Sequence, residues 1–171
     1  NSVQKYILKN EKDKALAFLQ NFSELMRNVL DNSGKPKVAL DEEINMLQKY
    51  ILLEQQRLEH QFDFTIDVDP NLQTDFFEVP GMIIQPYVEN AIWHGLMNLP
   101  ELRAGLQTGT VNTGNFEVRK GQLYLQFSRE KGNIKCVIQD NGVGRKNAAE
   151  LEKEKSPGRK NFGMSISQKR L

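Results

Sequence analysis

The sequence predicts an α+β fold, a two-layer sandwich preceded by an antiparallel helical hairpin. Two observations lead to this prediction. Apolar residues recur at helical spacing through residues 1–60, and several later segments alternate apolar with polar residues. Helices on one side of a domain and antiparallel strands on the other bury both kinds of apolar face. The 171 residues suffice for one domain with a helical extension.

Two helices are expected within residues 1–60. The segment 12–30 carries an apolar stripe in alternating steps of four and three, at Ala15, Leu19, Phe22, Met26 and Val29. Turn-forming residues from Asp31 to Pro36 end this helix. A second stripe, which Glu54 interrupts once, follows at Leu40, Ile44, Leu47, Ile51 and Leu58. The pattern leaves open whether both stripes pack onto the domain's own core or form a dimer interface.

The pattern changes at Gln61, so the sequence predicts a second domain over residues 61–171. Alternating residues at 62–68 indicate a strand, and an apolar helix is expected from about Met82 to Met97. Strands at 122–128 and 134–140 form a hairpin through the turn 130–133. Residues 145–155 are predicted to be helical, 156–161 to be a basic loop and 163–171 a last helix. The segment of about 99–120 has little periodicity, and we interpret it as an insertion or lid.

Composition excludes several classes of protein. A net charge of +1 gives no global field toward nucleic acid, so no nucleic-acid partner is expected. The single cysteine, Cys136, excludes an internal disulfide framework and suits a reducing, cytoplasmic compartment. No apolar run approaches the roughly 18 residues that a transmembrane helix needs. Because the chain begins at Asn1 rather than Met, we interpret it as a fragment of a longer protein. A membrane-anchored parent protein is compatible with this interpretation, and we expect one.

The first segment that carries chemistry is the run from Gln85 to Gly95. On a helix, Glu89, Asn90 and His94 lie within about one turn, with Asn90 and His94 on one face. A carboxylate, a carboxamide and an imidazole together can polarise a hydroxyl, hold hydrated Mg²⁺ and contact phosphate oxygens. Taken singly, each is more often an ordinary hydrogen-bonded polar group on a helix.

The second segment is Asp140-Asn141-Gly142-Val143-Gly144, which follows the apolar strand 134–138. An Asp-Asn-Gly run is also an ordinary turn signal. The functional interpretation is that Asp140 accepts a hydrogen bond from an amino group such as adenine N6. Gly142 and Gly144 would then let the backbone approach the base and sugar closely.

Together, in this order, the two segments resemble the N box and first glycine box of the histidine kinase/gyrase/Hsp90 (Bergerat) ATPase fold. More narrowly, the run Pro80–Gly95 is similar to the P-x-x-x-L-Q-P-L-V-E-N-A-I-x-H-G motif of LytS-like sensor histidine kinases. The helix around Leu40–Ile44 with Tyr50, Glu54 and Arg57 is similar to the helix that precedes this motif there. The resemblance covers the chain except for about residues 99–120.

The resemblance implies specific roles. Glu89 would be the general base, Asn90 the Mg²⁺ ligand and His94 a polar contact near the phosphates of ATP. Asp140 would recognise adenine, with Gly142 and Gly144 lining its pocket. Residues 145–162 would form the ATP lid and Gly163 the remaining glycine of the second glycine box. Arg170-Leu171 matches the end of this region in relatives.

Two departures from the family pattern bear on activity. The second glycine box usually carries several glycines, whereas Arg159–Phe162 occupy most of that approach here. The phosphoacceptor motif, which relatives place just before the segment that begins at Asn1 here, is absent. Of the two histidines, His94 belongs to the N-box helix, and we interpret His60 as a surface residue.

The sequence therefore predicts the ATP-binding catalytic region of a two-component sensor histidine kinase. With Mg²⁺ and ATP, the parent protein would phosphorylate a histidine missing from this fragment and then a response regulator, acting as a homodimer. The helices in residues 1–60 would carry the dimer contacts. One alternative is a degenerate, non-catalytic interaction module of the same fold. Another is an ATPase or protein-serine kinase of that fold.

Overall fold

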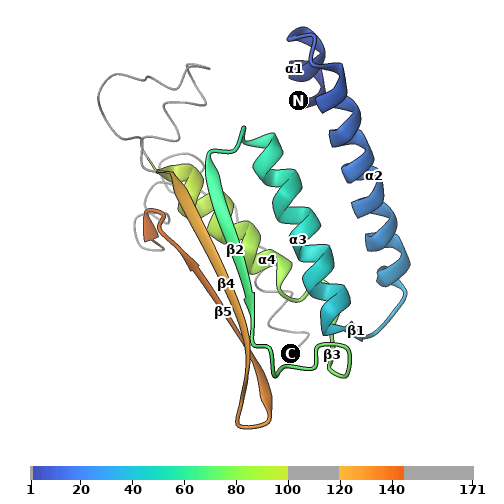
Figure 1. Cartoon of the computed structure of the whole chain (residues 1–171), viewed down its shortest axis with the longest axis vertical. Coiled ribbons are helices and arrows are strands. Elements are labelled where there is room, and N and C mark those ends of the chain that lie inside the picture. The colour runs from blue at the N-terminus through green and yellow to red at the C-terminus, as the bar shows by residue number, and fades with distance from the viewer. Residues whose placement is uncertain (1, 100–119, 145–171) are drawn as a thin grey trace, which may run out of the picture. The chain divides into compact units, whose positions relative to one another are not determined.

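The computed structural model describes residues 2–99 and 120–144 (Figure 1). It divides the chain into two compact units. The first comprises Asn1–His60 with Gln73–Ile83, and the second comprises Gln61–Leu72 with the residues from Ile84 onward. The chain therefore passes between the units three times, and the predicted boundary at residue 60 stays a prediction. The predicted mixture of helices and sheets is confirmed. Within the described ranges no helix is both long enough and apolar enough to span a bilayer.

Three helices build the first unit: α1 (Ser2–Leu8), α2 (Lys12–Ser33) and α3 (Leu40–Arg57). Helices α2 and α3 lie side by side (Figure 1). They run antiparallel, because Asn21 contacts Gln56 near one end and Glu24 forms an ion pair with Lys49 further along. The helical hairpin that the sequence predicts is thus present, with α1 as an additional short helix before it.

The apolar stripe predicted for α3 is confirmed as buried, at Leu40, Ile44, Leu47, Ile51 and Leu58. The stripe predicted for α2 is only partly buried within this chain, and its role as a dimer interface stays a prediction. Ala15 and Leu25 are buried, whereas Leu19, Phe22 and Met26 are exposed. The reason is that α2 has apolar residues on two neighbouring seams, and periodicity alone does not say which seam faces α3. The exposed seam, which we call the outer seam of α2, consists of Leu16, Leu19, Phe22, Met26 and Leu30.

A two-stranded sheet completes the first unit. Strand β1 (Val38–Ala39) pairs antiparallel with β3 (Glu78–Val79). Beyond β3, Met82 has a φ of +60°, which is a left-handed conformation that residues with a side chain rarely adopt. Its N–H donates to the carboxylate of Glu43 at 2.8 Å, and Glu43 is buried on α3. This bond helps to hold the backbone of Met82 in its unusual conformation.

A three-stranded sheet with the order β2-β4-β5 forms the centre of the second unit. Strands β4 (Gly121–Glu130) and β5 (Asn133–Asp140) form the predicted hairpin. Lys131 and Gly132 connect them with φ values of +50° and +85°, as a two-residue type I′ turn requires. This part of the prediction is confirmed.

The prediction of purely antiparallel strands is wrong, because β2 (Phe62–Val68) pairs with β4 in parallel. Parallel neighbours need a long crossover connection, and the chain between these strands includes the helical segment that starts at Gln85. The register aligns Phe64 with Leu123 and Ile66 with Leu125. Alternate residues therefore make one apolar face of the sheet, on which Leu123, Leu125 and Phe127 are fully or almost fully buried.

The helix predicted from about Met82 to Met97 begins later and is not regular. It consists of α4 (Gln85–Asn90), the π-helical turn η1 (Ala91–Gly95) and the 3-10 turn η2 (Leu96–Asn98). The left-handed backbone at Met82 prevents an earlier start, and Pro86 suits the first turn. Turns of the π type are found frequently at functional sites.

Some predictions fall outside the described residues. They are the insertion at about 99–120 apart from its two end residues, the whole ATP lid at about 145–162, the helix 163–171, Gly163 and Arg170-Leu171.

Candidate functional site

The candidate site lies where the end of the helical segment 85–98 meets the end of β5. Both elements belong to the second unit, and η1 contacts β5. Asp140 is the last residue of β5 and is paired with Leu123 across the sheet, so it lies at the end of the apolar face. The sheet thereby places the carboxylate of Asp140 beside the N-box segment. In the sequence, the two were connected only by the order of their motifs.

Two glycines make this approach possible. A Cβ atom built on Gly95 would lie 2.6 Å from Oδ1 of Asp140. A Cβ atom on Gly142 would lie 2.2 Å from the carbonyl carbon of Gly95 and 2.7 Å from the same Asp140 oxygen. In addition, the N–H of Val143 donates to the carbonyl oxygen of Gly95 at 3.2 Å. We call Gly95, Asp140, Gly142 and Val143 the glycine junction. Gly95 was not singled out from the sequence, although it stands in the motif.

The loop after β5 is fixed by its own side chains. Oδ1 of Asp140 accepts a hydrogen bond from the N–H of Gly142 at 2.9 Å, which closes a turn of the Asx type. Asn141 is bonded to the start of β4: its Oδ1 accepts from the N–H of Gln122 at 2.8 Å, and its Nδ2 donates to the carbonyl of Lys120 at 3.2 Å. The middle residue of Asp-Asn-Gly therefore continues the sheet pairing beyond the strand, a role that turn propensity does not reveal.

Gly144 and Gly142 meet different structural requirements for glycine. Gly144 has a φ of +78°, and among the described residues no atom lies within 4 Å of a Cβ built there. Gly144 therefore supplies a left-handed backbone, whereas Gly142 supplies the absence of a side chain. The sequence suggested close approach for both.

The polar residues of α4 are half-buried and bonded within the helix. Nδ2 of Asn90 donates to the carbonyl of Pro86 at 2.7 Å, so its Oδ1 is the atom available to a cation. Nε2 of Gln85 donates to Oε1 of Glu89 at 2.9 Å. A carboxamide oxygen and a carboxylate on adjacent residues are hard oxygen ligands of the kind that Mg²⁺ prefers. The residues present therefore fit an Mg²⁺-phosphate ligand.

His94 lies on the π-helical turn, next to Gly95 of the glycine junction. The sequence had placed it on a regular helix, one turn after Asn90. The wider turn displaces it from that ideal spacing. The carbonyl oxygen of His94 accepts a hydrogen bond from Nδ2 of the buried Asn98 at 2.9 Å. Asn98 was missed from the sequence, since it lies beyond the quoted motif. Among the described residues no cluster of His, Cys, Asp and Glu forms a ready-made metal site.

Comparison of the sequence with known proteins identifies the family of the chain. The family profile described as "Histidine kinase" matches residues 1–62. "Sensor protein LytS" of Oceanobacillus iheyensis is 30% identical over 138 residues, which is 81% of this chain and 20% of that protein. "Sensor histidine kinase/phosphatase LytS" of Staphylococcus aureus is 32% identical over 133 residues, 77% of this chain and 19% of that protein.

The chain thus spans about a fifth of the length of these curated relatives. Because each alignment is longer than 130 residues, it extends well beyond the helices that the family profile covers. The chain belongs to the family of LytS-like sensor histidine kinases.

Proposed function

We propose that this chain is the ATP-binding catalytic region of a two-component sensor histidine kinase, built as a two-layer sandwich of the Bergerat type. The observation that carries the proposal is the glycine junction. It brings the carboxylate of Asp140 to within a van der Waals contact of the helix that bears Glu89, Asn90 and His94. A nucleotide site of this kind needs an adenine-recognising carboxylate and phosphate-facing polar groups on neighbouring elements.

Asp140 is suited to the adenine end of such a site. It is exposed, so a ligand can reach it. Its Oδ1 is oriented by the N–H of Gly142, and Oδ2 takes no part in that bond. An oriented carboxylate oxygen can accept a hydrogen bond from the exocyclic amino group of adenine, and guanine offers a carbonyl at the equivalent position. We therefore expect preference for adenine nucleotides.

Asn90 and Glu89 are suited to the phosphate end. The hydrogen bond from Asn90 to Pro86 orients the carboxamide so that its oxygen would serve as the metal ligand. Glu89, held by Gln85, would act as general base toward the acceptor imidazole, and His94 would contact phosphate oxygens. Bound Mg²⁺ would neutralise charge on the phosphates. Gly163 would add backbone N–H groups from the second glycine box.

The remaining parts of the proposal concern the longer protein. A histidine outside this chain would receive the γ-phosphoryl group and pass it to a response regulator, on the cytoplasmic side of a membrane-anchored parent. We propose that the protein is a homodimer joined through the outer seam of α2. Its apolar residues are substantially exposed, with Leu16 at 59% and Leu30 at 67%, and they repeat at coiled-coil spacing.

The same outer seam favours a second candidate, a non-catalytic dimerisation module that keeps the fold. Isothermal titration of the chain with ATP and with ADP, each with and without Mg²⁺, distinguishes the two. We expect Mg²⁺-dependent ATP binding and a loss of roughly 10- to 150-fold in affinity for Asp140→Asn, since a hydrogen bond to a charged group contributes about 1.5–3 kcal/mol. Asp67→Asn, on the polar face of the sheet, is the matched control. Absence of nucleotide binding in the unaltered chain would favour the dimerisation module.

A further inference from the structure

The C-terminal end of α3 has a backbone conformation that normally calls for glycine. The N–H of His60 donates to the carbonyl of Gln55 at 2.8 Å, and the N–H of Glu59 donates to that of Gln56 at 3.2 Å. These two bonds define a Schellman motif, in which the residue after the cap is left-handed and usually glycine. Here that residue is Glu59, with a φ of +52°. A residue with a side chain is strained in this backbone conformation, so we expect a favourable contact of the Glu59 side chain that offsets the strain.

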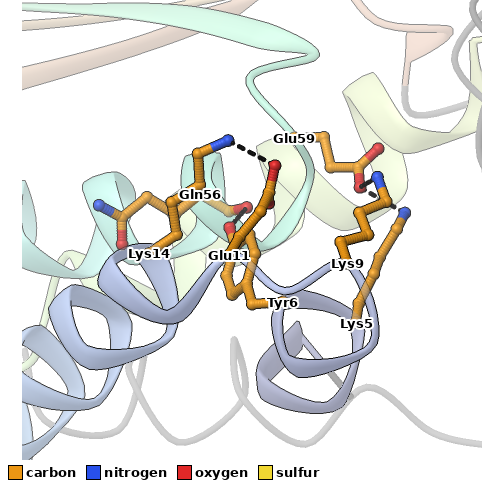
Figure 2. Close-up of polar contacts among 7 residues, drawn as sticks. All are labelled: Lys5, Tyr6, Lys9, Glu11, Lys14, Gln56 and Glu59. Carbon is orange, nitrogen blue, oxygen red and sulfur yellow. Dashed lines mark hydrogen bonds and ion pairs between the residues drawn. The ribbon is translucent and has the colours of Figure 1, made fainter.

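The contact is with α1. The carboxylate of Glu59 forms an ion pair with Lys5, and Nζ of Lys9 lies 3.7 Å from the same Oε1 atom (Figure 2). Beside them, the hydroxyl of Tyr6 donates to the carbonyl of Gln56 at 3.0 Å. The hydrogen bond from Lys5 is the largest of the influences that hold the pKa of Glu59 below its ordinary value. One carboxylate thus faces two cations, Lys5 on α1 and Lys9 in the turn directly after it.

Apart from these polar contacts with the end of α3, helix α1 packs against α2. Its seven residues are too few for a helix that is stable in isolation. Ile7 and Leu8 are 62% and 87% exposed, so they contribute little apolar burial. The ring of Tyr6 does contact that of Phe18 on α2, at 6.4 Å between centroids. Asn10, with a φ of +57°, separates α1 from α2 and lets the two helices differ in direction.

We propose that Glu59 occupies a glycine position because its carboxylate clamps α1 to the C-terminal end of α3. Glu59 and His60 are consecutive left-handed residues that directly precede Gln61 and β2, where the chain leaves the first unit. The clamp therefore ties α1 to the residues that lead into the sheet. Release of α1 removes one restraint on that connection. The contact between Glu59 and α1 does not depend on nucleotide binding, so this proposal can be tested independently of the proposed function.

Hydrogen exchange of the 171-residue chain tests the clamp. Glu59→Gln removes the charge and keeps the shape, whereas Glu59→Gly also relieves the left-handed strain. We expect both substitutions to accelerate amide exchange in α1 by roughly three- to tenfold, the effect of losing exposed ion pairs that act on one short helix. Glu59→Gly should at the same time slow exchange of the His60 amide, because glycine suits the turn. Glu24→Gln is the control, since it breaks an exposed ion pair between α2 and α3 without touching α1.

A charge exchange sharpens the test. Glu59→Lys should accelerate exchange in α1 further, and combining it with Lys5→Glu and Lys9→Glu should return exchange toward the original rate. Recovery of this kind identifies an ionic clamp, since a purely conformational role of residue 59 would not depend on the sign of the charge at positions 5 and 9. Unchanged exchange of α1 in Glu59→Gly, or no recovery in the triple variant, would overturn the proposal.

Discussion

Replacement of Gly142 by alanine tests the glycine junction directly. The added methyl group would lie 2.2 Å from the carbonyl carbon of Gly95 and 2.4 Å from its oxygen. Both atoms are backbone, so no side-chain rotation relieves the clash. The loop after β5 must move away from η1, and that movement lengthens the 3.2 Å hydrogen bond from Val143 to Gly95.

The expected cost follows from these two effects. Inserting a methyl group where backbone must shift costs about 1–3 kcal/mol, and weakening one hydrogen bond adds about 0.5–1.5 kcal/mol. We therefore expect Gly142→Ala to lower the free energy of unfolding of the second unit by about 1.5–4.5 kcal/mol. Urea unfolding followed by the fluorescence of Trp93 measures this quantity. Trp93 is the single tryptophan of the chain and lies on η1, two residues before Gly95.

Gly144→Ala is the matched control from the same loop. Its methyl group would meet no atom within 4 Å in the part of the chain that the structure describes, so the left-handed φ of +78° is the expected source of the cost. The expected cost is about 1 kcal/mol. Equal unfolding midpoints for Gly142→Ala and the unaltered chain, or a smaller loss than in Gly144→Ala, would refute the close approach of the loop to η1.

Three further outcomes are expected. Glu43→Ala should lower the free energy of unfolding by about 1–3 kcal/mol, because it leaves the backbone N–H of Met82 without this buried acceptor. The exposed neighbour substitution Glu42→Ala should change it by less than about 0.5 kcal/mol, and similar losses for the two variants in thermal denaturation would contradict this. Asn90→Ala should weaken Mg²⁺-dependent ATP binding more than metal-free ADP binding in titration calorimetry, and equal losses would mean that Asn90 acts only within the helix. Tyr124→Phe should raise the pKa of Asp67 in a carbon-13 NMR titration, because the hydroxyl of Tyr124, 2.8 Å away, is the largest cause of its lowered pKa. Since the pKa of folded Asp67 is lowered, its stabilising contribution is present above its unfolded value of about 3.9 and is lost as the pH falls through the folded pKa; an unchanged Asp67 titration in Tyr124→Phe would exclude the hydroxyl as the cause.

The sequence by itself determined those features that depend on neighbouring residues. The burial of Leu40, Ile44, Leu47 and Ile51 follows from helical periodicity, and the type I′ turn at Lys131-Gly132 follows from turn chemistry. Each is a property of one short stretch of chain, and its energy depends little on the rest of the molecule. The two motifs and their order also sufficed to assign the family, since each motif is a continuous run of residues that can be recognised without the fold.

Only the tertiary structure decided which distant residues meet. The parallel pairing of β2 with β4, the outward position of Leu19 and Met26, and the contact between Gly95 and Asp140 each depend on how separate elements pack. The sequence singled out Asp140 for its motif, but it gave no reason to connect Asp140 with Gly95, because a glycine after a histidine has many possible reasons. The requirement for glycine at position 95 becomes clear in the structure. The sheet fixes Asp140 beside η1, so any side chain at position 95 would occupy the volume of the Asp140 carboxylate. Steric exclusion between distant elements leaves no periodic signal, and packing alone reveals it.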